Sequence, residues 1–161
     1  KLQSTWQQME EIHRSGKARS IGLSNHPIHH MKEALESATI QPVVNQVELH
    51  PYLPQDELRA YCARQNIVVQ AWSPLASNKI PLLDEDVLAQ IGKKHGKSPA
   101  QVVLRWHLQL GVVPLPKSSN ADRQRENFQV FDFELSDQEM QQVNALDRDH
   151  RTGMHPDNIE F

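Results

Sequence analysis

Residues 43–73 read VVNQVELHPYLPQDELRAYCARQNIVVQAWS. They contain two runs rich in β-branched residues, separated by an amphipathic segment. The runs at 43–49 and 67–73 predict strands, and the segment 54–65 between them predicts a helix. Strands that flank a helix in this way run parallel and are joined by a right-handed crossover. We therefore predict an α/β fold with a parallel sheet.

Shorter apolar segments on both sides extend this alternation. Further strands are predicted at residues 19–24 and 112–116, and the two prolines of the second favour a short or irregular strand. Predicted helices precede, separate and follow these strands. The 161 residues suffice for one compact domain with an apolar core.

The predicted helices carry recognisable ends. A helix over residues 84–95 would be ended by Gly96, and a short helix is expected near Ala121. Three other helices are predicted to begin at capping serines: Ser4, three residues before Gln7; Ser98, directly before Pro99; and Ser136, three residues before Glu139.

Composition excludes several classes of function. The chain is 38% hydrophobic and 23% charged, with a net charge of −3. A mildly acidic chain without basic runs gives no electrostatic reason to expect nucleic acid or an anionic membrane as a partner. No stretch approaches the roughly 18 apolar residues of a membrane span. The single cysteine, Cys62, is expected to be a buried helix residue, and it fits the reducing cytoplasm.

Polar residues gather where each predicted strand ends, at residues 24–26, 45–51, 72–75 and 117–120. One such cluster alone is most simply a solvated loop. The carboxyl ends of parallel strands, however, share one rim of the sheet, and ligand sites form there. Together the clusters predict a ligand site at this rim.

The last cluster indicates an anionic ligand. Lys117, Ser118 and Ser119 supply a cation and hydroxyl groups ahead of the short helix near Ala121, and a helix N-terminus attracts anions. Arg123 and Arg125 follow inside that helix. Cations beside hydroxyls suit a phosphate monoester such as the 2′-phosphate of NADP.

Other rim residues suit the rest of such a ligand. Trp72 offers a flat face to an aromatic ring, and the amides of Asn25 and Gln46 could orient a carboxamide. Taken singly, Trp72 could instead belong to the core, and Arg123 could be a surface charge.

Common catalytic and cofactor motifs are missing from the sequence. It contains no G-x-G-x-x-G, no phosphate-binding loop and no G-x-S-x-G motif. His26 and His30 have the i, i+4 spacing of some zinc ligands, but the pair spans Pro27 and lacks the glutamate of an H-E-x-x-H motif. We interpret these two residues and His29 as surface histidines and predict no metal site.

Five segments together resemble the aldo-keto reductase family. They are GKARSIGLSN at residues 16–25, NQVELHP at 45–51, WSPL at 72–75, PKSSNADRQREN at 116–127 and FDFELS at 131–136. The resemblance covers nearly the whole chain from Trp6 onward. Within the family, the chain is most similar to prokaryotic reductases of the 2,5-diketo-gluconate reductase type.

This resemblance implies a (β/α)₈ TIM barrel that binds NADP(H) across its C-terminal rim and reduces aldehydes or ketones to alcohols. Residues 1–161 would form about strands 5–8 of that barrel with their helices, and residues 149–161 would be the tail that closes the substrate pocket. The matching motifs imply which residues would hold the cofactor. Its nicotinamide end would contact Ser24, Asn25 and Gln46 at the carboxamide and Trp72 on the ring, and its pyrophosphate would lie along Ser73, Leu75 and Ala76. Its adenosine end would contact Lys117, Ser118 and Arg123 at the 2′-phosphate and Glu126 and Asn127 at the adenine.

The family's catalytic Asp, Tyr, Lys and His belong to the first four strand–helix units, and this chain has no matching segment. The resemblance therefore assigns no catalytic residue here, and the chain by itself is expected to be inactive. A half barrel would also leave sheet edges open. We expect a separate N-terminal half, another chain or self-association to cover them. The alternative is a non-catalytic NADP(H)-binding or self-associating fragment.

Overall fold

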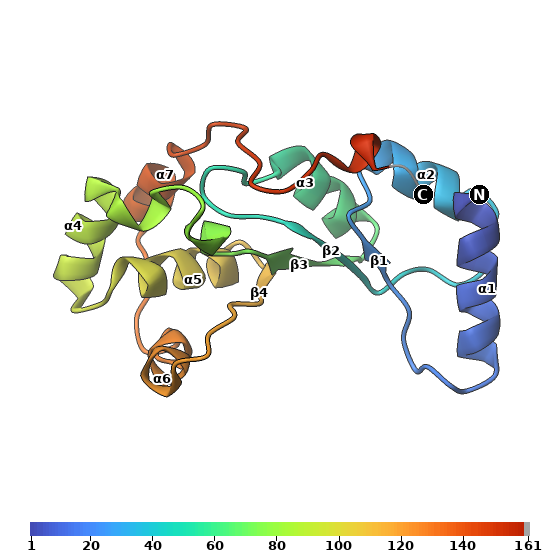
Figure 1. Cartoon of the computed structure of the whole chain (residues 1–161), viewed down its shortest axis with the longest axis horizontal. Helices are drawn as coiled ribbons and strands as arrows, with labels where there is room; N and C mark the ends of the chain where they lie inside the picture. The colour runs from blue at the N-terminus through green and yellow to red at the C-terminus, as the bar shows by residue number, and fades with distance from the viewer. Residues whose placement is uncertain (160–161) are drawn as a thin grey trace. The chain divides into compact units, whose positions relative to one another are not determined.

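Strands and helices alternate from α1 to β3 in the computed structural model, and helix pairs precede and follow β4 (Figure 1). The structure describes residues 1–159, with Asn78 described by its backbone alone. Among the described residues, no helix is both long enough and apolar enough to cross a membrane. The α-helices are α1 (Leu2–Arg14), α2 (Ile28–Leu35), α3 (Asp56–Arg64), α4 (Asp86–His95), α5 (Pro99–Gln109), α6 (Ala121–Phe128) and α7 (Asp137–Asn144). The strands are β1 (Leu23–Ser24), β2 (Val44–Glu48), β3 (Val68–Trp72) and β4 (Val113–Pro114), and 3₁₀ turns lie at η1 (Ala76–Asn78), η2 (Leu82–Asp84) and η3 (Pro156–Asn158).

The strands follow the order β1-β2-β3-β4 in one sheet. β1 and β2 are parallel, with Leu23 opposite Asn45 and Ser24 opposite Gln46. The predicted α/β class and the predicted order of elements are therefore confirmed.

The first strand is shorter than the sequence predicted, and the last strand is short, as its prolines predicted. Only two residues of the run 19–24 and two of the run 112–116 are assigned to strands. At the last strand, prolines 114 and 116 have no N–H to donate, so the ladder cannot extend. A backbone bond from Leu115 N to the carbonyl of Ala71 (3.0 Å) still joins β4 to β3.

Contacts divide the chain into two compact units. The first comprises Lys1–Val47, Gln55–Gln70 and the C-terminal residues from Pro156 on. In it, α1 packs against α2. Cys62 of α3 is fully buried, as predicted, and burial raises the pKa of its thiol.

The second unit comprises Glu48–Pro54 and Ala71–His155, and α4, α5 and α7 pack against one another in it. Its core side chains are almost or completely inaccessible to solvent: Leu88, Val102, Val103, Leu104, Trp106 and Val143. The last two residues of the predicted tail 149–161 lie outside the described residues.

Two of the three predicted capping serines are confirmed. Ser98 and Ser136 each form a complete capping box, at the starts of α5 and α7. Gly96 adopts the left-handed conformation (φ 65°) that ends α4. The prediction at Ser4 is wrong, because α1 already begins at Leu2 and the Ser4 hydroxyl donates back to the carbonyl of Lys1 (2.9 Å).

Candidate functional site

Three predicted site residues lie together where β1 and β2 end. Ser24 stands opposite Gln46 in the parallel register, and the backbone N–H of Asn25 donates to the carbonyl of Gln46 (2.9 Å). Asn25 has a φ of 55°, a left-handed conformation that asparagine tolerates better than most residues. The Gln46 amide in turn donates to Gln70 on β3 (3.0 Å), which fixes its orientation. Sequence reasoning missed Gln70, whose signal was a polar residue inside an apolar strand.

The loop after β3 is strained at the positions predicted to follow the pyrophosphate. Ser73, Ala76 and Ser77 have φ values of 48°, 55° and 52°, although none of them is glycine. Each such residue costs on the order of 1–3 kcal/mol, and such strain gathers at ligand-binding sites. The turn is held by a bond from Ala76 N to the carbonyl of Ser73 (2.8 Å) and by a hydroxyl pair between Ser73 and Ser77 (2.6 Å). Leu75 is half-buried at the start of the η1 turn.

Trp72, the predicted ring-stacking residue, is half-buried and lies against the backbone of Gly153. A Cβ atom on Gly153 would come within 2.6 Å of the indole Cη2. The tail therefore passes over one edge of this indole, and only a glycine fits at the crossing.

Glu48 anchors that tail, and sequence reasoning missed it. Its carboxylate is 1% exposed and accepts bonds from Thr152 N (2.7 Å), Thr152 Oγ1 (2.5 Å), Gly153 N (3.1 Å) and His50 Nε2 (3.1 Å). Burial by itself would raise the pKa of Glu48, but the hydrogen bonds from His50, Thr152 and Gly153 outweigh it and lower the pKa to about 2. The available signal was a charged residue at the end of a β-branched-rich strand.

The same contacts indicate which ring nitrogen of His50 carries the hydrogen. A carboxylate can only accept, so Nε2 of His50 carries the proton in its bond to Glu48. Nδ1 of the fully buried ring has no hydrogen-bond partner among the described residues.

The predicted phosphate-binding segment forms a capped turn before α6. Asn120 is the N-cap, and its side chain accepts from the backbone N–H groups of Asp122 (2.9 Å) and Arg123 (3.0 Å). The Ser118 hydroxyl bonds to the backbone of Asn120. The prediction that this helix N-terminus offers its N–H groups to an anion therefore needs correction, because two of them are already bonded.

Two cationic side chains of this segment remain available to bind an anion. Lys117 and Arg123 are exposed, and neither forms an ion pair with another described residue. In contrast, Arg125 of the same helix is paired with Asp122 (2.7 Å). An anion would therefore meet two unneutralised cations, one before α6 and one inside it.

Glu126 and Asn127 differ in their surroundings. The Glu126 carboxylate accepts from the Ser98 hydroxyl, and its carbonyl accepts from Gln101 Nε2 (3.0 Å), so this residue fastens α6 to the start of α5. Asn127 lines a cavity of about 560 Å³ together with Lys117. The rest of that cavity is mostly apolar: Leu104, Leu108, Val113, Pro114, Leu115, Pro116, Gln124, Phe128, Val130 and Phe131.

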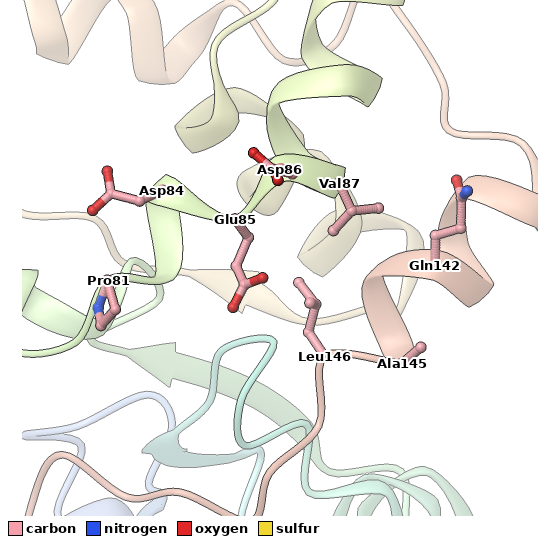
Figure 2. A pocket seen from close by; sticks show the side chains of 8 residues that line it. All are labelled: Pro81, Asp84, Glu85, Asp86, Val87, Gln142, Ala145 and Leu146. Atoms are coloured by element: carbon pink, nitrogen blue, oxygen red, sulfur yellow. The ribbon is translucent and has the colours of Figure 1, made fainter.

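A second cavity, of about 610 Å³, contains none of the predicted site residues (Figure 2). Glu85 lines it and accepts both from the Tyr52 hydroxyl and from Arg148. Burial and the bond to Glu85 raise the pKa of Tyr52 to about 12. The phenol is thereby held protonated as a donor to Glu85.

Comparison with known proteins identifies the family of the chain. The model of the "Aldo/keto reductase family" matches residues 1–148. The chain belongs to this family. It is 51% identical over 161 residues to the glyoxal reductase of Bacillus subtilis (strain 168), covering 100% of this chain and 58% of that protein.

Two further relatives extend the comparison. Over 152 residues the chain is 41% identical to the methylglyoxal reductase DkgA of Escherichia coli (strain K12), covering 94% of this chain and 55% of that aldo-keto reductase relative. A crystal structure of a Gox0644 mutant in complex with NADPH superimposes with a TM-score of 0.92 at 40% identity, covering 98% of this chain and 58% of the other. The chain thus spans somewhat over half the length of the relatives it matches.

Proposed function

We propose that this chain supplies the NADP(H)-binding half, about strands 5–8, of a (β/α)₈ aldo-keto reductase barrel that reduces small aldehydes or ketones. The observation that carries the proposal is the placement of backbone strain. Of the seven described non-glycine residues with a positive φ, Asn25, Ser73 and Ala76 are assigned to the cofactor by the family motifs. Ser77 lies beside Ala76, and the other three, Gln55, Asn66 and Asp149, lie outside the assigned set. Such strain persists where a ligand-binding geometry is maintained against local preference.

The relatives supply the substrate class. Two of them are named for the reduction of glyoxal and methylglyoxal, and one is crystallised with NADPH. When bound, NADPH supplies the hydride that reduces a carbonyl carbon. The single buried cysteine, Cys62, fits a cytoplasmic enzyme.

The chain's own residues would bind and orient the cofactor. Lys117 and Arg123 would neutralise the 2′-phosphate, which distinguishes NADP(H) from NAD(H). Trp72 would present its indole to the nicotinamide ring. The remaining assigned residues are Ser24, Asn25 and Gln46 for the carboxamide, Ser73, Leu75 and Ala76 for the pyrophosphate, Ser118 for the phosphate, and Glu126 and Asn127 for the adenine.

Proton donation would come from elsewhere. Reduction of a carbonyl needs a group that protonates the developing alkoxide, and no residue of this chain is assigned that role. The second candidate function is therefore a non-catalytic, NADP(H)-binding or self-associating half barrel. It is favoured by apolar residues of the strand segments that are 42–47% exposed: Val43, Val68, Val113 and Leu115. Parallel strands are normally covered on both faces, so an N-terminal half or a second copy would cover them.

A fluorescence titration with NADPH tests the cofactor assignment. Wild-type protein should bind saturably, and Arg123→Ala should weaken NADPH binding roughly 10- to 100-fold, because a charge-assisted hydrogen bond is worth about 1.5–3 kcal/mol. Binding of NADH, which lacks the 2′-phosphate, should change little. Arg125→Ala is the matched control, since Arg125 is paired with Asp122 on the same helix.

Two kinds of outcome would contradict the proposal. Absence of any NADPH binding, or equal losses in the Arg123 and Arg125 variants, would contradict the assigned phosphate site. Turnover of methylglyoxal by this chain alone would contradict the assignment of proton donation to another segment.

A further inference from the structure

Three potential metal ligands from opposite ends of the sequence meet in the first unit. His29 and His30 lie in the first turn of α2, and Asp157 lies in η3. Oδ1 of Asp157 is 2.9 Å from Nε2 of His29 and 3.3 Å from Nε2 of His30. The ligand atoms of all three residues lie within 4.8 Å of one another.

These separations match the edges of a coordination polyhedron. With metal–ligand bonds of about 2.0–2.1 Å, neighbouring ligands are about 3.0 Å apart in an octahedron and about 3.3 Å apart in a tetrahedron. Both imidazole Nε2 atoms lie at nearly this distance from Oδ1 of Asp157. The two rings are tilted by 63° with centroids 4.4 Å apart, so adjacent residues present their Nε2 atoms to one point from different directions.

We propose that His29, His30 and Asp157 form a binding site for a divalent transition metal ion, with Zn²⁺, Co²⁺ or Ni²⁺ as the fitting class. Imidazole nitrogens favour these ions over Mg²⁺ and Ca²⁺, which prefer an all-oxygen shell. The side chains of His29, His30 and Asp157 are 63%, 24% and 43% exposed, so water completes the coordination sphere. The ion cross-links η3 to α2.

The proposal also explains why spacing in the sequence did not predict this site. Spacing drew attention to His26 and His30, whereas the carboxylate comes from a residue 128 positions after His29. The simpler alternative is a hydrogen bond from His29 to Asp157 and an ion-pair contact of His30 with the same oxygen, without any metal. Because both readings use the same contacts, only a direct binding measurement separates them.

Co²⁺ is a suitable probe, because its visible absorption reports inner-sphere nitrogen and oxygen ligands. Untagged protein should be titrated with Co²⁺ at pH 7.5, and bound Co²⁺ should then be displaced by Zn²⁺. We expect one equivalent of Co²⁺ to produce a visible band that Zn²⁺ removes.

His30→Gln is the decisive variant, since glutamine can still donate a hydrogen bond to Asp157 but is a poor ligand for these ions. We expect at least roughly tenfold weaker Co²⁺ binding in this variant and in Asp157→Asn, because even outer-shell changes cost that much. His150→Asn is the control, as His150 is an exposed histidine of the second unit. Absence of the Co²⁺ band in the wild type, or equal binding by His30→Gln and the wild type, would overturn the proposal.

Discussion

Replacing Glu48 by glutamine removes one buried negative charge and preserves the volume of the side chain. In the wild type, this carboxylate fixes residues 152–153 of the tail through bonds to both backbone N–H groups and to the Thr152 hydroxyl. In the Glu48→Gln variant, the amide NH₂ would face N–H donors that the carboxylate satisfies. The tail should therefore lose its attachment where it crosses Trp72.

The size of the effect follows from the lowered pKa of Glu48. Each pKa unit corresponds to about 1.4 kcal/mol. The fall from 4.5 to about 2 then corresponds to about 3 kcal/mol by which folding favours the ionised carboxylate at pH 7. We expect Glu48→Gln to lower the unfolding free energy by this amount, and the melting temperature by roughly 6–12 °C for a chain of this size.

The effect should depend on pH in a defined direction. A carboxyl group whose pKa is lower in the folded state stabilises the protein above its unfolded-state pKa, and this contribution is lost as the pH falls toward the folded-state value. Stabilisation by Glu48 should therefore be complete above about pH 5 and decline between pH 4.5 and about 2. At pH 3 the difference between wild type and variant should shrink to about 1 kcal/mol.

Urea unfolding at pH 7 and pH 3 measures both quantities, and hydrogen exchange at the amides of Thr152 and Gly153 reports the attachment directly. Glu134→Gln is the matched control, because Glu134 is 82% exposed and its pair with Arg105 should contribute less than about 1 kcal/mol. A difference between wild type and Glu48→Gln that is equal at both pH values would refute the reasoning. So would unchanged exchange at the two amides.

Three further substitutions test the packing and the helix ends. Gly153→Ala should lower the unfolding free energy by about 1–3 kcal/mol and alter the tryptophan emission spectrum, because the added Cβ would lie 2.6 Å from the indole of Trp72. Thermal unfolding and fluorescence measure the two effects. A variant with unchanged stability and emission would contradict the close approach. Ser136→Ala should cost about 1 kcal/mol by removing the cap of α7, whereas Ser4→Ala should be nearly neutral because Ser4 caps no helix. Equal losses of stability in these two serine variants would argue against the assigned helix starts.

Much of the fold could be predicted because its signals are local. Ser98 and Ser136 cap helices through bonds to residues three positions away, so a short pattern contains the whole interaction. Ser4 carries a similar pattern and fails, because the N-cap of α1 is Lys1, three residues earlier, which places the serine in the first turn of the helix. A local pattern thus identifies a helix more reliably than its first residue.

The candidate site was predicted only in part. The motifs singled out Ser24, Asn25 and Gln46, and the parallel register brings them together. The motifs did not indicate that the Asn120 side chain would accept from two N–H groups at the start of α6, because these bonds depend on the conformation of the turn before the helix. The interpretation of Lys117 and Arg123 as an anion site consequently depends on their side chains and not on the helix N-terminus.

By itself, the sequence determined the alternation of strands and helices, most of the helix ends and the family, since each of these depends on residues that are near one another in the chain. Only the tertiary structure decided which distant groups meet. Glu48 reaches Thr152 across 104 positions, and His29 reaches Asp157 across 128. No spacing rule links residues so far apart, because their proximity follows from how the intervening helices and strands pack.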